Sequence, residues 1–243
     1  MKDKCPHTPK TRADEADYNE YFGTCSDPIG STEWDEHRGK TLAKFIDDIS
    51  TTNLSDDSLR TLLIGLSLDD DAAEETVIDA EIDRWKLGHQ IFDLLLDGIN
   101  ATLADAVATD PVNDPDRIVD LLLRISKQYR ASTVSFSYAA DFTREAYESR
   151  VRPTMAPEQM PEAFSGSLNE KHRNMKKLLS SMTAKLDSAF GKDKQLWPQA
   201  IRQAFEAVLE AKAENLSNHG SICEHFVPGG KSLLREYLTR VDG

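Results

Sequence analysis

The sequence predicts an all-α protein, a bundle of about five main helices with short connections. Apolar residues recur every three or four positions in several long segments, and no segment alternates apolar and polar residues over the length of a strand. Prolines and glycines fall between these segments. Of the 243 residues, 39% are hydrophobic, which is enough for a sizeable core. We expect residues 1–38 to form an N-terminal arm and residues 39–243 to form one helical domain.

Composition and charge exclude several classes of protein. A net charge of −13 repels phosphate backbones, so we expect no nucleic-acid partner. No apolar run approaches the ~20 residues that span a membrane, and the N-terminus lacks the apolar core of a signal peptide. The three cysteines, Cys5, Cys25 and Cys223, are scattered and odd in number, which argues against a disulfide framework. The sequence therefore predicts a cytoplasmic protein without a membrane partner.

The order of the helices follows from periodicity and from the residues that interrupt it. Asp110 and Asp114 precede prolines and are suitable helix caps. The two prolines after Arg152 are expected to force an extended path, because proline disfavours helix in the residue before it. The predicted helices cover residues 41–49, 56–68, 72–107, 116–147, 168–190, 197–216 and 231–240.

The first long helix carries a histidine on an apolar face. Trp85, His89 and Phe92 share that face, with Leu96 next along it. A histidine in such a position is more often a core residue than a catalyst, and the aromatic residues beside it are as well suited to a core as to a ligand pocket. The pattern alone leaves both roles open.

The last long helix ends in a second histidine. If the helix continues to Phe226, His219 and Cys223 lie one turn apart on one face. The imidazole could then ligate a haem iron, and the thiol could reach the edge of the macrocycle. The alternative is a capped helix end with a small buried thiol, and Gly220, a weak helix former, leaves a break at that point open.

Three stretches, taken in order, resemble the tryptophan dioxygenase superfamily of haem-dependent aromatic oxygenases. Residues 88–94, Gly-His-Gln-Ile-Phe-Asp-Leu, resemble its His-Gln-x-aromatic-acidic-Leu segment. Residues 152–157, Arg-Pro-Thr-Met-Ala-Pro, with Phe164 and its neighbours, resemble its Arg-x-x-Leu-x-Pro and Gly-Phe-Gln-Ser pair. His219 with the Gly229-Gly230 loop resembles its proximal histidine and Gly-Thr-Gly-Gly loop. The resemblance covers residues 75–240.

Departures from the dioxygenases point to one branch of that superfamily. The loop at 227–230 has no threonine, and position 223 is Cys where the dioxygenases carry an apolar residue. The His-x-x-x-Cys spacing and the Arg-Pro-x-Met stretch are more similar to the haem-dependent tyrosine and 3-methyltyrosine hydroxylases of antibiotic pathways. Those enzymes are peroxygenases, which insert an oxygen from hydrogen peroxide ortho to the phenol, and in some of them the cysteine forms a thioether to the haem.

The resemblance implies a haem cofactor and assigns each site residue a role. His219 would be the proximal iron ligand, with Cys223 as the covalent link and His225 as the next candidate ligand. His89, with a reference pKa near 6.5, would act as acid and base above the iron. The substrate-binding residues would be Arg152 for the carboxylate, with Arg150 as the fallback, and Trp85, Phe92, Phe164, Gly229 and Gly230.

Three functional hypotheses follow. The first is a haem peroxygenase hydroxylating L-tyrosine or a close derivative. The second is a dioxygenase or monooxygenase acting on tryptophan or another indole. The third is a haem-binding or helical interaction protein without turnover. The resemblance further implies an aromatic amino acid and hydrogen peroxide or dioxygen as small-molecule partners. It also implies a homo-oligomer in which the N-terminal arm, around Tyr18 to Trp34, contacts a neighbouring chain.

Overall fold

The computed structural model describes residues 77–154 and 169–227, and in these ranges the protein is helical without a strand, as predicted. The predicted arm at 1–38 and the predicted helices at 41–49, 56–68 and 231–240 lie outside the described residues. Within them, no helix combines the length and the apolar character that crossing a membrane requires. The helices are α4 (Val77–Ala108), α5 (Pro115–Ala139), α6 (Arg144–Ala146), η1 (Tyr147–Val151), α7 (Arg152–Thr154), α8 (Glu170–Phe190), η2 (Lys194–Leu196) and α9 (Gln199–Phe226).

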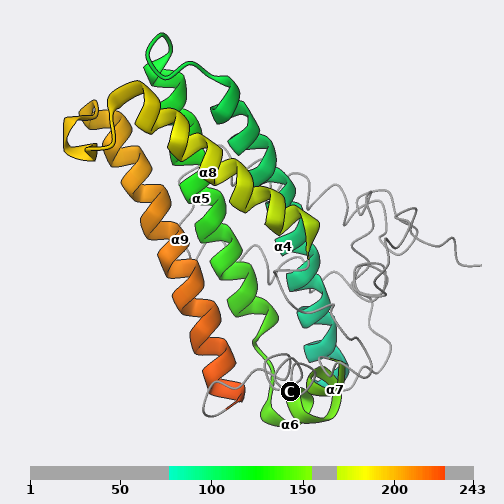
Figure 1. Ribbon diagram of the computed structural model, residues 1–243. Coiled ribbons are helices and arrows are strands. Elements are labelled where there is room, and N and C mark those ends of the chain that lie inside the picture. The colour runs from blue at the N-terminus through cyan, green and yellow to red at the C-terminus, as the bar shows by residue number, and fades with distance from the viewer. Residues whose placement is uncertain (1–76, 155–168, 228–243) are drawn as a thin grey trace, which may run out of the picture.

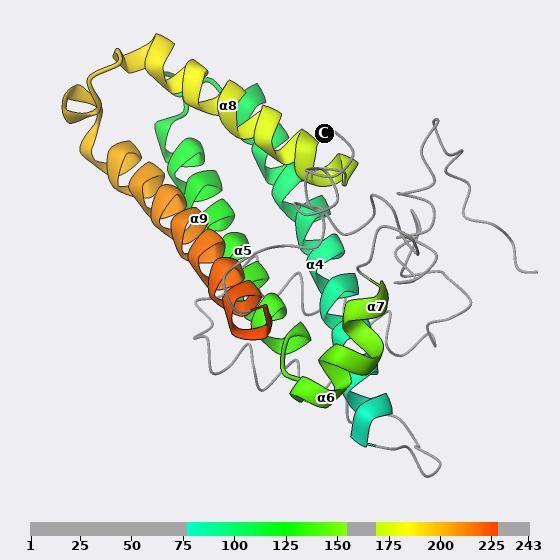
Figure 2. The same cartoon turned by 60° about the horizontal axis from the view of Figure 1, so that its bottom comes forward.

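The helix α5 is the centre of the bundle. It packs against α4 on one side and α9 on the other, while α8 lies on α4 (Figure 1). Figure 2 shows α9 running beside α5 and α8 crossing toward the start of α9. The short helices α6 and α7 lie at the end of the bundle where α4 begins and where α9 ends (Figure 1). Two long helices thus flank α5 at the end that carries both histidines.

The main core fills the opposite end of the bundle. Its members are apolar side chains with little or no exposed surface, which is the pattern expected of helices that bury one stripe each. Trp197 closes this end, because its indole Nε1 donates to the carbonyl of Gly191 at 2.7 Å. The core residues from α4, α5, α8 and α9 include Leu103, Ile118, Leu121, Ile125, Met182, Leu186, Ile201, Phe205 and Val208.

Helix ends follow the predicted capping chemistry in part. Asp114 caps α5 by accepting a hydrogen bond from the backbone N–H of Arg117, and Pro115 occupies the first turn, where its missing N–H costs nothing. Asn169 caps α8 in the same way, accepting from the N–H of His172 at 2.9 Å. Asp110 instead organises the turn between α4 and α5, accepting from the N–H groups of Val112 and Asn113.

The predicted helix at 116–147 is wrong in its second part. The structure ends α5 at Ala139 and starts α6 only at Arg144. Side chains from α4 hold the connection: Arg84 donates to the carbonyl of Asp141 at 2.7 Å, and Thr143 donates to Glu81 at 2.9 Å. Helical periodicity does not reveal these tertiary hydrogen bonds, which replace those lost at the break.

The extended path predicted for residues 150–154 is also wrong. The chain there is helical, and a π-helical stretch, Tyr147–Val151, precedes the turn that contains Pro153. In that stretch the N–H of Arg152 bonds to the carbonyl of Tyr147, five residues back. A widened turn of this kind accommodates a residue that has no N–H of its own. Burial of Tyr147 and Val151 against α4 and α9 outweighs the local preference of proline.

Candidate functional site

The close approach of α4 and α5 fixes the position of the first histidine. A side-chain carbon at Gly88 would lie 2.4 Å from Cβ of Ala139, which is closer than such atoms approach. Only glycine lets the two helices meet at this point. The neighbouring residue, His89, is therefore held at the helix crossing by backbone packing.

His89 is neutral in this setting. Its Nδ1 lies 2.8 Å from the carbonyl of Trp85, and since a carbonyl only accepts, Nδ1 carries the proton and Nε2 carries the lone pair. The Trp85 ring meets the imidazole edge-on at 5.3 Å. The pKa of His89 is lowered to about 4, mainly by burial and to a smaller extent by the nearby charge of His219, against the raising effect of the Trp85 hydrogen bond. The expected reference value near 6.5 does not apply to this partly buried ring.

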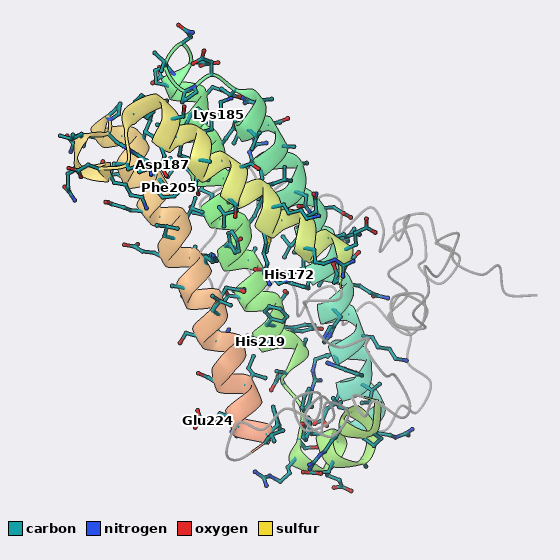
Figure 3. The ribbon with its side chains drawn as sticks, in the orientation of Figure 1. His172, Lys185, Asp187, Phe205, His219 and Glu224 are labelled. Carbon is teal, nitrogen blue, oxygen red and sulfur yellow. The ribbon has the colours of Figure 1, made fainter. Side chains whose placement is uncertain are left out.

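The second histidine lies on an unbroken helix. The helix α9 continues beyond the predicted end at 216 and through Gly220 to Phe226, which fulfils the condition under which His219 and Cys223 lie one turn apart on one face of the backbone. His219 lies at the surface, but its ring is 5.3 Å from that of Phe136, and partial burial lowers its pKa. Figure 3 labels His219 on the part of α9 that runs beside α5. The side chain of Cys223 lies outside what the structure describes.

Phe136 connects the two histidine-bearing helices. Its ring lies 4.4 Å from that of Phe92 on α4 and 5.3 Å from that of His219 on α9. His89 lies close enough to His219 for the charge of one to affect the pKa of the other. Phe136 was not predicted as a site residue, because one aromatic residue in a helix carries no signal of its own.

The described residues of the site offer two nitrogen donors, His89 and His219. In the described part of the chain, no three His, Cys, Asp or Glu side chains converge to hold an ion. A haem iron takes four ligands from its macrocycle and one or two from the protein. Two neutral imidazoles, His89 on α4 and His219 on α9, would be enough for that smaller requirement.

The acidic residue of the 88–94 stretch has a structural role. Asp93 is 2% exposed and accepts from Nζ of Lys171 at 2.5 Å, and the same nitrogen donates to Asp97 at 2.8 Å. Burial raises the pKa of Asp93 to about 6, although Lys171 and Asn169 act in the opposite direction. This group fixes the beginning of α8 on α4, one turn from His89.

The two predicted arginines lie on the short helices beside the site. Arg152 donates from Nη1 to both carboxylate oxygens of Glu148, at 3.2 and 3.0 Å. Its side chain is 38% exposed, and Arg150 is exposed on the π-helical stretch. Their roles in binding a substrate stay predictions.

An aromatic cluster ties these short helices to the end of α9. The ring of Phe226 lies 4.6 Å from that of Phe142 and 4.7 Å from that of Tyr147. Trp85, 2% exposed, belongs to the same buried cluster, and its role in binding a substrate stays a prediction. The remaining predicted substrate residues, Phe164, Gly229 and Gly230, lie outside the described residues.

Comparisons with known proteins agree with the resemblance in the sequence. The model of the family described as SfmD 3-methyl-L-tyrosine peroxygenase matches residues 2–199. That range includes His89, Arg152 and Phe164 and ends before His219. A 3-methyl-L-tyrosine peroxygenase of Streptomyces lavendulae is 27% identical over 148 residues, which cover 59% of this chain and 37% of the length of that protein. No solved structure matches the chain.

Proposed function

This chain belongs to the SfmD 3-methyl-L-tyrosine peroxygenase family, and on that premise we propose that it is a haem-dependent peroxygenase that hydroxylates the ring of L-tyrosine or a close derivative. The observation that carries the proposal is the pair of neutral histidines, His89 on α4 and His219 on α9, which lie close enough for their charges to interact, with the ring of His219 beside Phe136. When bound, the haem would supply the oxygen-transfer chemistry, and the protein would supply binding, orientation and proton transfer.

His219 would hold the iron. A ligating imidazole must be neutral, and its lowered pKa keeps His219 in that form at neutral pH. Its position one turn before Cys223 on α9 lets the same helix supply a thioether to the macrocycle edge. Denaturation in acid followed by extraction with organic solvent tests this link: a covalent haem stays with the polypeptide. Release of all the haem would reduce Cys223 to a packing residue.

His89 would act on the substrate side. With its proton fixed on Nδ1 by Trp85, the Nε2 lone pair can accept a proton from a phenol or from hydrogen peroxide. The low pKa of His89 keeps its imidazole neutral across the neutral range. Phe92, whose ring packs against Phe136, would lie beside the aromatic ring of the substrate, and Arg152 would bind its carboxylate through its planar guanidinium.

The test begins with the absorption spectrum of the purified chain and continues with product mass. We expect a haem band, and a gain of one oxygen on L-tyrosine or 3-methyl-L-tyrosine when hydrogen peroxide is supplied. The matched reaction supplies L-tryptophan with dioxygen and a reductant. Oxygen gained by tryptophan alone would replace the proposal with an indole oxygenase, and a chain that never binds haem would refute both.

A further inference from the structure

The polar contact between α5 and α9 lies beside His219 and has no part in the proposed chemistry. Asn215 donates through its amide nitrogen to Oγ of Ser132 at 2.9 Å and to Oγ1 of Thr133 at 3.1 Å. Asn218 donates to the carbonyl of Thr133 at 3.1 Å and to Oγ of Ser137 at 2.9 Å. These four hydrogen bonds are called the amide ladder below. They span the turn of α9 that ends at His219.

The direction of these hydrogen bonds is set by α5. Each of its three hydroxyls gives its own proton to a carbonyl three or four residues back: Ser132 and Thr133 to Tyr129, and Ser137 to Thr133. Their oxygens therefore face α9 as acceptors only. A side chain with two N–H donors matches this surface, and a carboxylate of the same shape would meet it with repulsion.

The amide ladder takes the place of apolar packing in the part of α9 next to His219. Up to Ala211, α9 meets the bundle through apolar residues that are at most 3% exposed, and in the described side chains beyond it the next buried apolar residue is Phe226, 7% exposed. Apolar contacts tolerate small rotations and slides of a helix, whereas four directional hydrogen bonds set one rotation and one register. A rotation of α9 about its axis would swing His219 away from Phe136.

We propose that Asn215 and Asn218 are positioning residues that set the rotation of α9 on α5, so that His219 presents its imidazole toward the iron. This inference rests on the proposed function, since it gives the ladder a purpose through haem ligation. We therefore expect loss of the amide ladder to change haem affinity and the haem absorption band while the chain still folds.

The experiment compares Asn218→Asp with two controls in the full chain, titrated with haem. Asn218→Asp keeps the shape and removes both donors, so haem affinity should fall about tenfold and the haem absorption band should move. Asn174→Asp makes the same chemical change on α8, where Asn174 bonds Asn100 at 3.3 Å across an exposed contact, and should match wild type. Val208→Ala, fully buried in the main core, should lower the melting temperature without moving the band.

Each outcome decides one part of the inference. An unchanged band and affinity in Asn218→Asp would overturn it, and so would a Val208→Ala variant that loses haem in proportion to its stability. If Asn218→Asp does not fold, Ser137→Ala removes one acceptor from the opposite helix and should produce the same change at smaller size. Wild-type chain that binds no haem would instead refute the proposed function, which keeps the two failures apart.

Discussion

The helices α5 and α9 contact each other through apolar packing at one end and through hydrogen bonds at the other. At the end near Trp197, called the core half, α9 meets α5 through Ile201, Phe205 and Val208, each at most 1% exposed. At the end near His219, called the site half, the contact is the amide ladder. Apolar burial supplies most of the stability of a bundle, while directional hydrogen bonds specify one orientation. Within this pair of helices, the core half therefore stabilises the fold, and the site half sets the orientation of His219.

The largest loss of stability is expected from a cavity in the core half. Phe205 is 1% exposed, packs against Trp197 at 5.4 Å and lies under Nζ of Lys194 at 4.7 Å. We expect Phe205→Ala to lower the free energy of unfolding by about 3–5 kcal/mol, measured in urea. Leu209→Ala, on the same helix but 37% exposed, should cost far less. The amount of haem bound per folded chain should stay unchanged. A loss of haem would show that the core half also controls haem binding.

Protonation of His89 should make the fold less stable in acid. Because burial lowers its pKa from 6.5 to about 4, the unfolded chain binds this proton more tightly than the folded one. The free energy of unfolding should fall as the pH drops from about 6.5 to 4, by up to about 3 kcal/mol at ~1.4 kcal/mol per pH unit. His219 contributes in the same direction.

Asp93 acts with the opposite sign. Its pKa is raised from 3.8 to about 6, so the folded chain binds that proton more tightly and gains stability as the pH falls through this range. Urea unfolding at several pH values between 7 and 4 should show a flatter acid loss for His89→Gln and a steeper one for Asp93→Asn. Parallel curves for the three proteins would show that neither buried group controls the response.

The helix crossing beside His89 should resist any added atom. Gly88→Ala places a carbon against both Cβ and backbone of Ala139, and we expect a loss of about 1–3 kcal/mol with weaker haem binding. The double variant Gly88→Ala/Ala139→Gly removes the closest of these contacts and should recover part of both losses. Gly220→Ala serves as the control, since a side chain there meets nothing within 4 Å. A neutral Gly88→Ala would refute the role of the crossing.

The smallest expected change in stability is at Arg152. A half-exposed pair such as Arg152–Glu148 contributes less than ~1 kcal/mol, so Arg152→Ala should unfold at nearly the same urea concentration as wild type. Its KM for the amino acid should rise strongly if the guanidinium binds the carboxylate. Glu148→Gln, which removes the competing carboxylate, should lower KM. Equal KM values in all three proteins would remove Arg152 from the site.

Sequence reasoning recovered what periodicity and local chemistry control. Most of each long helix and the cap at Asp114 follow from spacing and local chemistry, and spacing places His219 and Cys223 on one face once the helix is known to reach Phe226. It failed where tertiary contacts decide: the break after Ala139 depends on a hydrogen bond that Arg84 donates and one that Glu81 accepts, and the helical turn at Pro153 depends on burial of its neighbours. Phe136 and the amide ladder were missed for the same reason, although the serines and threonines at 132–137 are an unusual run inside a helix.

The absorption spectrum of His219→Ala, purified beside His225→Ala, decides whether the site half presents His219 to a haem. His225 is exposed and lies six residues along the same helix, away from the His219 face, with its ring edge-on to Phe226 at 4.6 Å. We predict that His219→Ala purifies largely free of haem and that His225→Ala keeps the wild-type band. Full haem occupancy in His219→Ala, or loss of haem only in His225→Ala, would show that His219 does not hold the haem.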